Sequence, residues 1–173
     1  SARYNAVTNW TKETLELPYR YQPGERFTYC SPMVSLLSTI VARATRLSTR
    51  EFADWYLCEP LGITVRRWET DPQGNYLGGV GVHMTGRDLA RFGYLFANGG
   101  AVGGRQVVPA EWIRTTLTPH VELDRTWGAL TNVDYGYLWW TAEFRRVSVA
   151  LAAGYAGQFL VVVPSHHLVV VLA

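Results

Sequence analysis

The sequence predicts an α+β fold in which an antiparallel sheet packs against helices. Helical signals fill most of the chain before residue 117, whereas β-branched runs dominate after about Asp134. The last two runs are separated by Pro164-Ser165-His166-His167, a connection of hairpin length. Helices first and strands last is an order typical of α+β folds. The chain has no internal repeat or low-complexity tract, so we expect residues 1–173 to belong to one domain.

The first helices are predicted from their start signals. Val7 to Leu17 is weakly amphipathic and precedes a turn at Pro23-Gly24. Ser31 followed by Pro32 is typical of an N-cap and a first helical residue. Apolar residues at helical spacing then predict the buried face of this helix. They are Leu37, Ile40, Val41 and Ala44.

Two capping boxes predict further helices. Ser48 with Glu51 three residues later opens a helix that we expect to run to about Tyr56. Thr85 with Asp88 opens another, which the pair Gly99-Gly100 should end. The predicted buried side of this second helix carries Leu89, Phe92 and Phe96.

The remaining elements are a short helix and four strands. The helix is expected from Pro109 to about Leu117, and loop-like sequence follows to about Asp134. β-Branched and aromatic residues then predict the strands. The expected strands are Tyr135–Ala142, Val147–Ala152, Gln158–Val163 and Leu168–Leu172.

Composition excludes several classes of function. The net charge is +2 and no basic cluster occurs, so we expect no nucleic-acid partner. Glycine, proline and histidine interrupt the apolar region Val147–Ala173, which therefore predicts strands and no membrane span. The four histidines form no metal-binding spacing, so no metal site is expected. Cys58 lies in an apolar context and is expected in the core. Nothing in the sequence assigns a compartment.

Two segments resemble active-site motifs. Pro23-Gly24 and Phe27 precede Tyr29-Cys30-Ser31 at a helix start, and Ala152-Ala153-Gly154-Tyr155 precedes a Val-rich strand. Together they resemble the second and third motifs of the serine hydrolases that include class C β-lactamases, penicillin-binding DD-peptidases and related esterases. Further segments follow in the order of that family. They are Glu59-Pro60-Leu61-Gly62-Ile63, Gly78-Gly79, the stretch from Thr85 to Gly93, Trp112 and Tyr137-Leu138-Trp139-Trp140.

The first motif of that family, Ser-x-x-Lys, supplies the nucleophile and is missing. No serine is followed by lysine three positions later, and Lys12 is the only lysine. The resemblance therefore implies an incomplete β-lactamase/transpeptidase-like fold, a partial domain without its N-terminal nucleophile region and its closing C-terminal helix. A sheet cut in this way should expose an apolar face, through which the chain could self-associate.

The resemblance implies a role for each matching residue. Tyr29 would assist proton transfer, and the backbone N–H of Tyr155 would form half of an oxyanion hole. Ser31, Ala152 and Gly154 would contact substrate, with Gly154 keeping a side chain out of its path. Ala152 stands where the family has Lys or His and cannot recruit a substrate carboxylate. An ester or amide substrate is therefore favoured over a β-lactam.

Each of these residues also has a plainer interpretation. Ser31 is explained as an N-cap, Tyr29 as a packing residue, and Gly154 as a strand start or bulge. Trp140 could line a substrate cleft or pack in the core.

At the level of the whole chain, the main hypothesis is part of a serine hydrolase that acts by acyl-enzyme transfer on a small-molecule acyl substrate. The alternative is a non-catalytic relative that binds a ligand or partner in the retained cleft. A purely structural domain is a third possibility.

Overall fold

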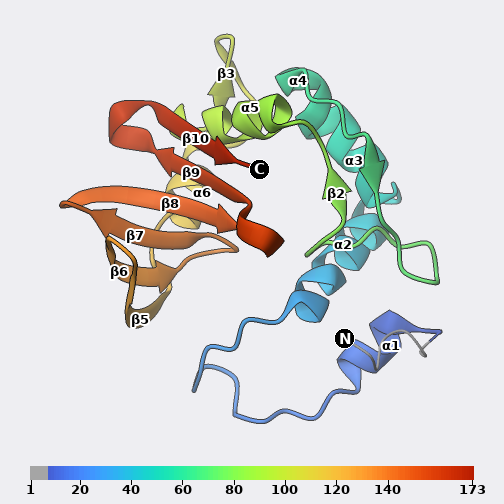
Figure 1. Cartoon of the computed structure of the whole chain (residues 1–173). Coiled ribbons are helices and arrows are strands. Elements are labelled where there is room, and N and C mark those ends of the chain that lie inside the picture. Colours follow the sequence, from blue (N-terminus) through green and yellow to red (C-terminus); the bar gives the residue numbers. More distant parts are fainter. Residues whose placement is uncertain (1–7) are drawn as a thin grey trace. The chain divides into compact units, whose positions relative to one another are not determined.

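The computed structural model describes residues 8–173, whose elements belong to two compact units (Figure 1). Unit 1 comprises the chain up to Cys58 together with Val65–Met84, and unit 2 comprises Glu59–Thr64 together with Thr85–Ala173. Val7, the first residue of the predicted N-terminal helix, lies outside the described residues.

Helices are the main secondary-structure elements of unit 1. Its first helix is shorter than predicted because Asn9 caps it, accepting a hydrogen bond from the N–H of Lys12. A pair of two-residue antiparallel strands completes the unit and was not predicted. The elements are α1 (Trp10–Leu15), α2 (Ser31–Thr45), α3 (Thr49–Ala53), a π-helix (Asp54–Cys58), β1 (Arg67–Trp68) and β2 (Val82–His83).

Helix α2 begins one residue earlier than predicted. Cys30 is the N-cap, Ser31 is the first helical residue, and no side chain caps the helix. The predicted N-cap role of Ser31 is therefore wrong. The N–H of Val34 donates to the carbonyl of Cys30 at 3.4 Å, which adds Ser31 to the helix. Pro32 is tolerated here because first-turn N–H groups have no partner inside a helix.

The predicted buried face of α2 is also wrong. Leu37 and Ile40 are 47% and 58% exposed, whereas Ser38 is buried. Ser38 Oγ donates to Thr49 Oγ1 at 2.7 Å, and Thr49 Oγ1 donates to the carbonyl of Ser38 at 2.9 Å. These two hydrogen bonds join α2 to the start of α3, so the face that carries Ser38 is the packed one.

The capping box before α3 is confirmed. The N–H of Glu51 donates to Ser48 Oγ, and the N–H of Ser48 donates to Glu51 Oε2. The helical segment continues through the π-helix and α4 (Glu59–Leu61), past the predicted end at Tyr56. Cys58 is buried, as predicted.

Unit 2 is a six-stranded antiparallel sheet with helices, which confirms the α+β class. The sheet has the order β10-β9-β8-β7-β6-β5. Its strands are β5 (Val121–Trp127), β6 (Leu130–Tyr135), β7 (Trp140–Phe144), β8 (Val147–Ala153), β9 (Phe159–Val163) and β10 (Leu168–Leu172). The other elements are α4, α5 (Gly86–Ala97), β3 (Ala101–Val102), β4 (Arg105–Gln106) and α6 (Ala110–Thr116).

Strands β5 and β6 occupy the segment predicted as a loop, which is a correction. β5 lies at the sheet edge and is mostly exposed. Apolar and charged residues alternate only over residues 121–124, because Asp124 has a left-handed backbone (φ 46°) and the register with β6 shifts there. The predicted strand Tyr135–Ala142 is also wrong in extent. A turn over residues 136–139, with Leu138 at φ 67°, separates β6 from β7.

Helix α5 packs against one face of the sheet at β9 and β10 (Figure 1). Thr85 caps α5 by accepting the N–H of Asp88, as predicted. The close contact of α5 with β9 and β10 requires Gly93, because a Cβ there would lie 2.6 Å from Val169 Cγ1 and 2.7 Å from Leu160 Cδ1. The interior of this helix–sheet layer is closely packed.

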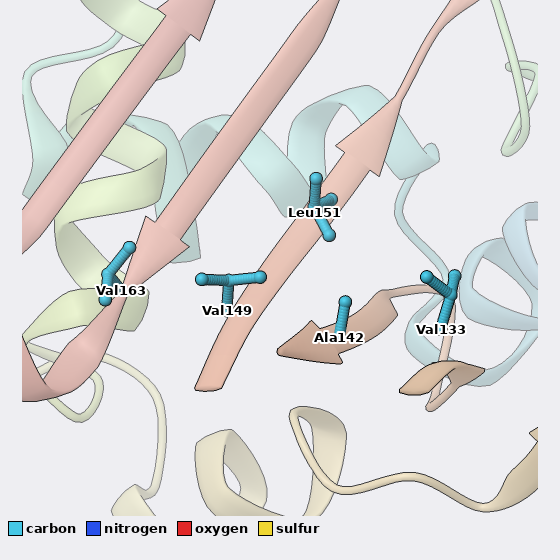
Figure 2. Packing of buried hydrophobic residues seen from close by; sticks show 5 residues of the cluster. All are labelled: Val133, Ala142, Val149, Leu151 and Val163. Carbon is cyan, nitrogen blue, oxygen red and sulfur yellow. The ribbon is translucent and has the colours of Figure 1, made fainter. Parts of the chain in front are cut away.

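The opposite face of the sheet carries the hydrophobic cluster in Figure 2. The register places its members on neighbouring strands with their side chains on one face. The members are Val133, Ala142, Val149, Leu151 and Val163. On β10 the same face carries Leu168, Val170 and Leu172, which are exposed. The expected apolar exposure is therefore present, and self-association through it stays a prediction.

Within residues 8–173, no helix has the length and apolar character that a membrane crossing needs.

Candidate functional site

The Tyr-x-Ser segment lies at the start of α2 in unit 1. Tyr29 is in the extended segment before the helix, with its side chain 53% exposed, and Ser31 is the first helical residue. Gly78 and Gly79 pass over this first turn. A Cβ on Gly78 would lie 2.6 Å from the carbonyl oxygen of Val34, and one on Gly79 would lie 2.9 Å from that of Ser31. The two glycines allow a backbone contact that holds the motif in place.

Ser31 also forms part of the wall of a cavity in unit 1. The cavity has a volume of about 240 Å³ and is lined by α1, the first turns of α2 and the segment from Asp71 to Val80. Sequence reasoning missed this cavity, because it forms only when the segment around Asn75 and Leu77 folds against both helices.

Gly154 begins the hairpin loop between β8 and β9 in unit 2. The register between the strands is regular up to the pair Ala153 and Phe159, so the interpretation of Gly154 as a bulge is wrong. Gly154 is extended (φ −104°, ψ 174°), and its N–H donates to the carbonyl of Gln158 at 2.8 Å. The three residues between them form a short 3-10 turn.

Tyr155 occupies the tip of this loop. Its side chain is 93% exposed. Its backbone N–H makes no hydrogen bond to any described residue. The next residue, Ala156, has a left-handed backbone at φ 60°. A donor held in a tight loop with no protein acceptor is what an oxyanion hole requires.

The two adjacent tryptophans have different environments. Trp139 is buried, and its ring lies 4.6 Å from that of Phe96, so it is a core residue. Trp140 lies in β7 opposite Leu151, three residues before Gly154, and therefore at the same end of the sheet as the hairpin loop. It contacts the rings of Tyr135 at 4.9 Å and Trp127 at 6.2 Å.

A row of aromatic rings extends from Trp140 along this face. Trp127 of β5 also contacts Phe159 of β9, at 5.5 Å between ring centroids. Sequence reasoning missed Trp127 and Phe159, because their proximity depends on strand register and no local signal reports it. The core and cleft interpretations of Trp140 are both compatible with this position.

A second stack of rings lies on the turn between β6 and β7. Tyr137 stacks on His120 at 4.1 Å and on Trp112 at 5.7 Å. His120 Nε2 lies 2.8 Å from the carbonyl of Thr115, which fixes the orientation of the imidazole. The imidazole of His120 is therefore held between its stacking contact with Tyr137 and the backbone at Thr115.

The two carboxyls with shifted pKa values belong to helix caps. The Thr85 hydroxyl donates to Asp88, and this hydrogen bond, aided by Arg91, holds the pKa of Asp88 below its ordinary value. The side chain and then the backbone of Ser48 likewise lower the pKa of Glu51. Among residues 8–173, no three His, Cys, Asp or Glu side chains gather into a metal site.

The structure thus brings the predicted site residues together in two groups. Tyr29 and Ser31 flank the start of α2 in unit 1. Ala152, Gly154, Tyr155 and Trp140 lie at one end of the sheet in unit 2. Ala152 is near the end of β8, and its methyl group carries no charge.

The fold and both motifs define a β-lactamase-like protein. A sequence model of the Beta-lactamase family matches residues 3–173, so the chain belongs to this family.

Two relatives show how much of the family domain is covered. A 6-aminohexanoate-dimer hydrolase of Paenarthrobacter ureafaciens is 32% identical over 144 residues, which cover 78% of this chain and 35% of that protein. An uncharacterized protein of Alkalihalophilus pseudofirmus is 26% identical over 190 residues, covering 91% of this chain and 54% of that protein. The chain thus spans between a third and just over half of the length of these relatives.

Solved structures share the fold. A protein from Bacillus anthracis, assigned provisionally as a 6-aminohexanoate-dimer hydrolase, has a TM-score of 0.82 at 23% identity. The match covers 99% of this chain and 44% of that protein. A penicillin-binding protein from Bacillus halodurans has a TM-score of 0.68 at 18% identity. This match covers 94% of this chain and 56% of that protein. At these identities the likeness concerns the fold, which is an incomplete β-lactamase/transpeptidase-like fold.

Proposed function

We propose that this chain supplies the second and third active-site segments of a serine hydrolase that works by acyl transfer. The observation that carries the proposal is that one chain holds both Tyr29-Cys30-Ser31 at a helix start and, in a tight loop, a Tyr155 N–H without a hydrogen bond to any described residue. Family membership and a hydrolase among the relatives support it.

The proposed reaction has two steps. A serine outside these 173 residues attacks the carbonyl carbon, and Tyr29 with an accompanying lysine moves the proton from the serine to the leaving group. The N–H of Tyr155 donates to the oxygen on which negative charge develops. Water then releases the acyl group. The mechanism requires neither a metal nor an organic cofactor.

We propose an ester or amide substrate in preference to a β-lactam. Ala152 carries no charge or hydrogen-bonding group on its side chain, so it offers nothing to a substrate carboxylate. The expected substrates are uncharged near the scissile bond.

The nucleophile requirement is tested on the chain itself. Residues 1–173 should show no labelling by a fluorophosphonate or a penicillin probe, because no serine is followed by a lysine three positions later. Stoichiometric labelling at any serine would contradict the proposal.

The role of Tyr29 is tested in a chimera. This chain replaces the matching segment of the Paenarthrobacter 6-aminohexanoate-dimer hydrolase, which keeps the rest of its own sequence. Hydrolysis of p-nitrophenyl esters should fall about 100-fold or more in Tyr29→Phe, the lower range for general acid–base catalysis. Tyr19→Phe is the matched control, because Tyr19 is exposed in the same unit. Equal activity of the two variants would refute the role of Tyr29.

A non-catalytic relative that binds a ligand is the second candidate. The missing Ser-x-x-Lys and the cavity beside Ser31 favour it. Under this alternative, the uninterrupted coding sequence upstream of residue 1 encodes no Ser-x-x-Lys, while the chain still binds small molecules. An upstream Ser-x-x-Lys would favour the serine hydrolase over the non-catalytic relative.

A further inference from the structure

We infer that the 240 Å³ cavity in unit 1 is a binding pocket for a small, uncharged apolar group, such as a single aromatic ring or a short alkyl chain. If the proposed function holds, on which this part of the inference rests, the same pocket receives the apolar part of the substrate beside Ser31. The inference depends on the size of the cavity, the chemistry of its wall and the hydrogen bonds that hold the wall in place.

The size of the cavity limits the ligand. An apolar protein cavity of about 150 Å³ is large enough to bind benzene. A volume of about 240 Å³ therefore holds one ring with a short substituent. Pockets for drug-sized molecules start at about 300 Å³, so a larger ligand would place only one of its groups here.

Most of the surface of the cavity wall is apolar. Its apolar surface includes Trp10, Pro32, Leu36 and Leu77. Asp71 is the only Asp, Glu, Lys, Arg or His among the described residues of the wall. Its Oδ1 accepts the N–H groups of Gln73 and Asn75, and its Oδ2 accepts Asn75 Nδ2.

Two hydroxyls in the wall are likewise engaged with the backbone. Thr14 Oγ1 donates to the carbonyl of Trp10 at 2.8 Å, and Ser35 Oγ donates to that of Ser31 at 3.4 Å. The described wall residues include no Lys, Arg or His, so a carboxylate ligand would lose its hydration without gaining a counter-charge. The pocket should therefore reject carboxylate groups.

Hydrogen bonds hold the wall in its open form. The N–H of Trp10 donates to Gln73 Oε1 at 3.1 Å, which joins α1 to the loop. Trp68 Nε1 donates to the carbonyl of Leu77 at 2.8 Å, which fixes the other side. The pocket is therefore formed before a ligand arrives, and binding requires little ordering of the wall.

Binding is tested by methyl NMR on residues 1–173, with toluene as the probe. We expect saturable shifts at the methyl groups of Leu36, Leu77 and Val80. Hexanoate should bind at least tenfold more weakly. The absence of saturable shifts at these methyls, up to the solubility limit of toluene, would overturn the inference without any variant.

Two neighbouring residues of α2 give matched variants. Leu36→Trp fills the pocket and should weaken toluene binding at least tenfold, whereas Leu37→Trp places the same side chain on the exposed face and should leave it unchanged. Equal binding by the two variants would overturn the inference. If Leu36→Trp does not fold, Val80→Phe replaces it with the same expectation.

The outcomes separate this inference from the proposed function. Toluene binding together with a fully active Tyr29→Phe chimera would refute the catalytic proposal and keep the pocket. No toluene binding together with an active, Tyr29-dependent chimera would refute the pocket and keep the catalytic proposal.

Discussion

The contact between α5 and the sheet makes a quantitative prediction for Gly93→Ala. The new Cβ would lie 2.6 Å from Val169 Cγ1 and 2.7 Å from Leu160 Cδ1, both closer than real Cβ contacts. Leu160 is fully buried and Val169 is stiff at χ1, so neither can move away freely. Gly86→Ala in the same helix is the matched control, because its Cβ would meet only Val171 Cγ1, at 3.8 Å.

The expected magnitude has two parts. Replacing glycine by alanine inside a helix stabilises it by about 1 kcal/mol, whereas overpacking a core costs about 1–3 kcal/mol. Both variants gain part of the stabilisation that alanine gives a helix, and only Gly93→Ala also has the cost of overpacking. Gly93→Ala should therefore be about 2 kcal/mol less stable than Gly86→Ala. At a urea dependence of about 2 kcal/mol per M, the unfolding midpoints would differ by about 1 M.

Urea unfolding followed by far-UV circular dichroism measures this difference. Hydrogen exchange of the amides in β9 and β10 shows whether the loss lies at the predicted contact. An unfolding midpoint for Gly93→Ala at or above that of Gly86→Ala would refute the packing argument.

Two further predictions concern unit 2. The Thr85 hydroxyl lowers the pKa of Asp88, so the stability from this carboxylate is present above its unfolded pKa of about 4 and is lost as the pH falls through the folded value. Thr85→Ala should therefore be less stable than the parent chain near pH 7, with a gap that narrows below about pH 4; a gap constant down to pH 3 would contradict this. Thr141 Oγ1 is buried without a hydrogen-bond partner among the described residues, so Thr141→Val should raise the free energy of unfolding by about 1 kcal/mol. Thr131→Val, at an exposed position of β6, should show no comparable gain in the same urea assay.

Local chemistry made parts of the fold predictable. The caps at Ser48 and Thr85 were predicted because a side chain and an N–H three residues away decide them. Strand β5 was missed because apolar and charged residues alternate only over residues 121–124, beyond which its pairing with β6 is irregular. The buried face of α2 was wrong because periodicity shows which residues share a face without showing which face packs.

The candidate site was predictable to a different extent. The positions of Tyr29 and Tyr155 follow from motifs that can be read along the chain, and the structure places them at a helix start and a hairpin tip. The cavity beside Ser31 could not be predicted, since its wall joins residues around Trp10, Pro32 and Leu77. Such a wall depends on the long-range approach that Gly78 and Gly79 permit.

The position of β10 has a consequence for handling the molecule. It is the outer strand of its sheet, and its five residues, Leu168–Leu172, carry no charge and no proline. The strand has no charged residue or proline that would hinder another extended segment from pairing with the free N–H and C=O groups of its outer edge. Concentrated samples should therefore convert to thioflavin-positive fibrils. A single lysine at Val170 should delay this conversion without disturbing the side chains that face α5.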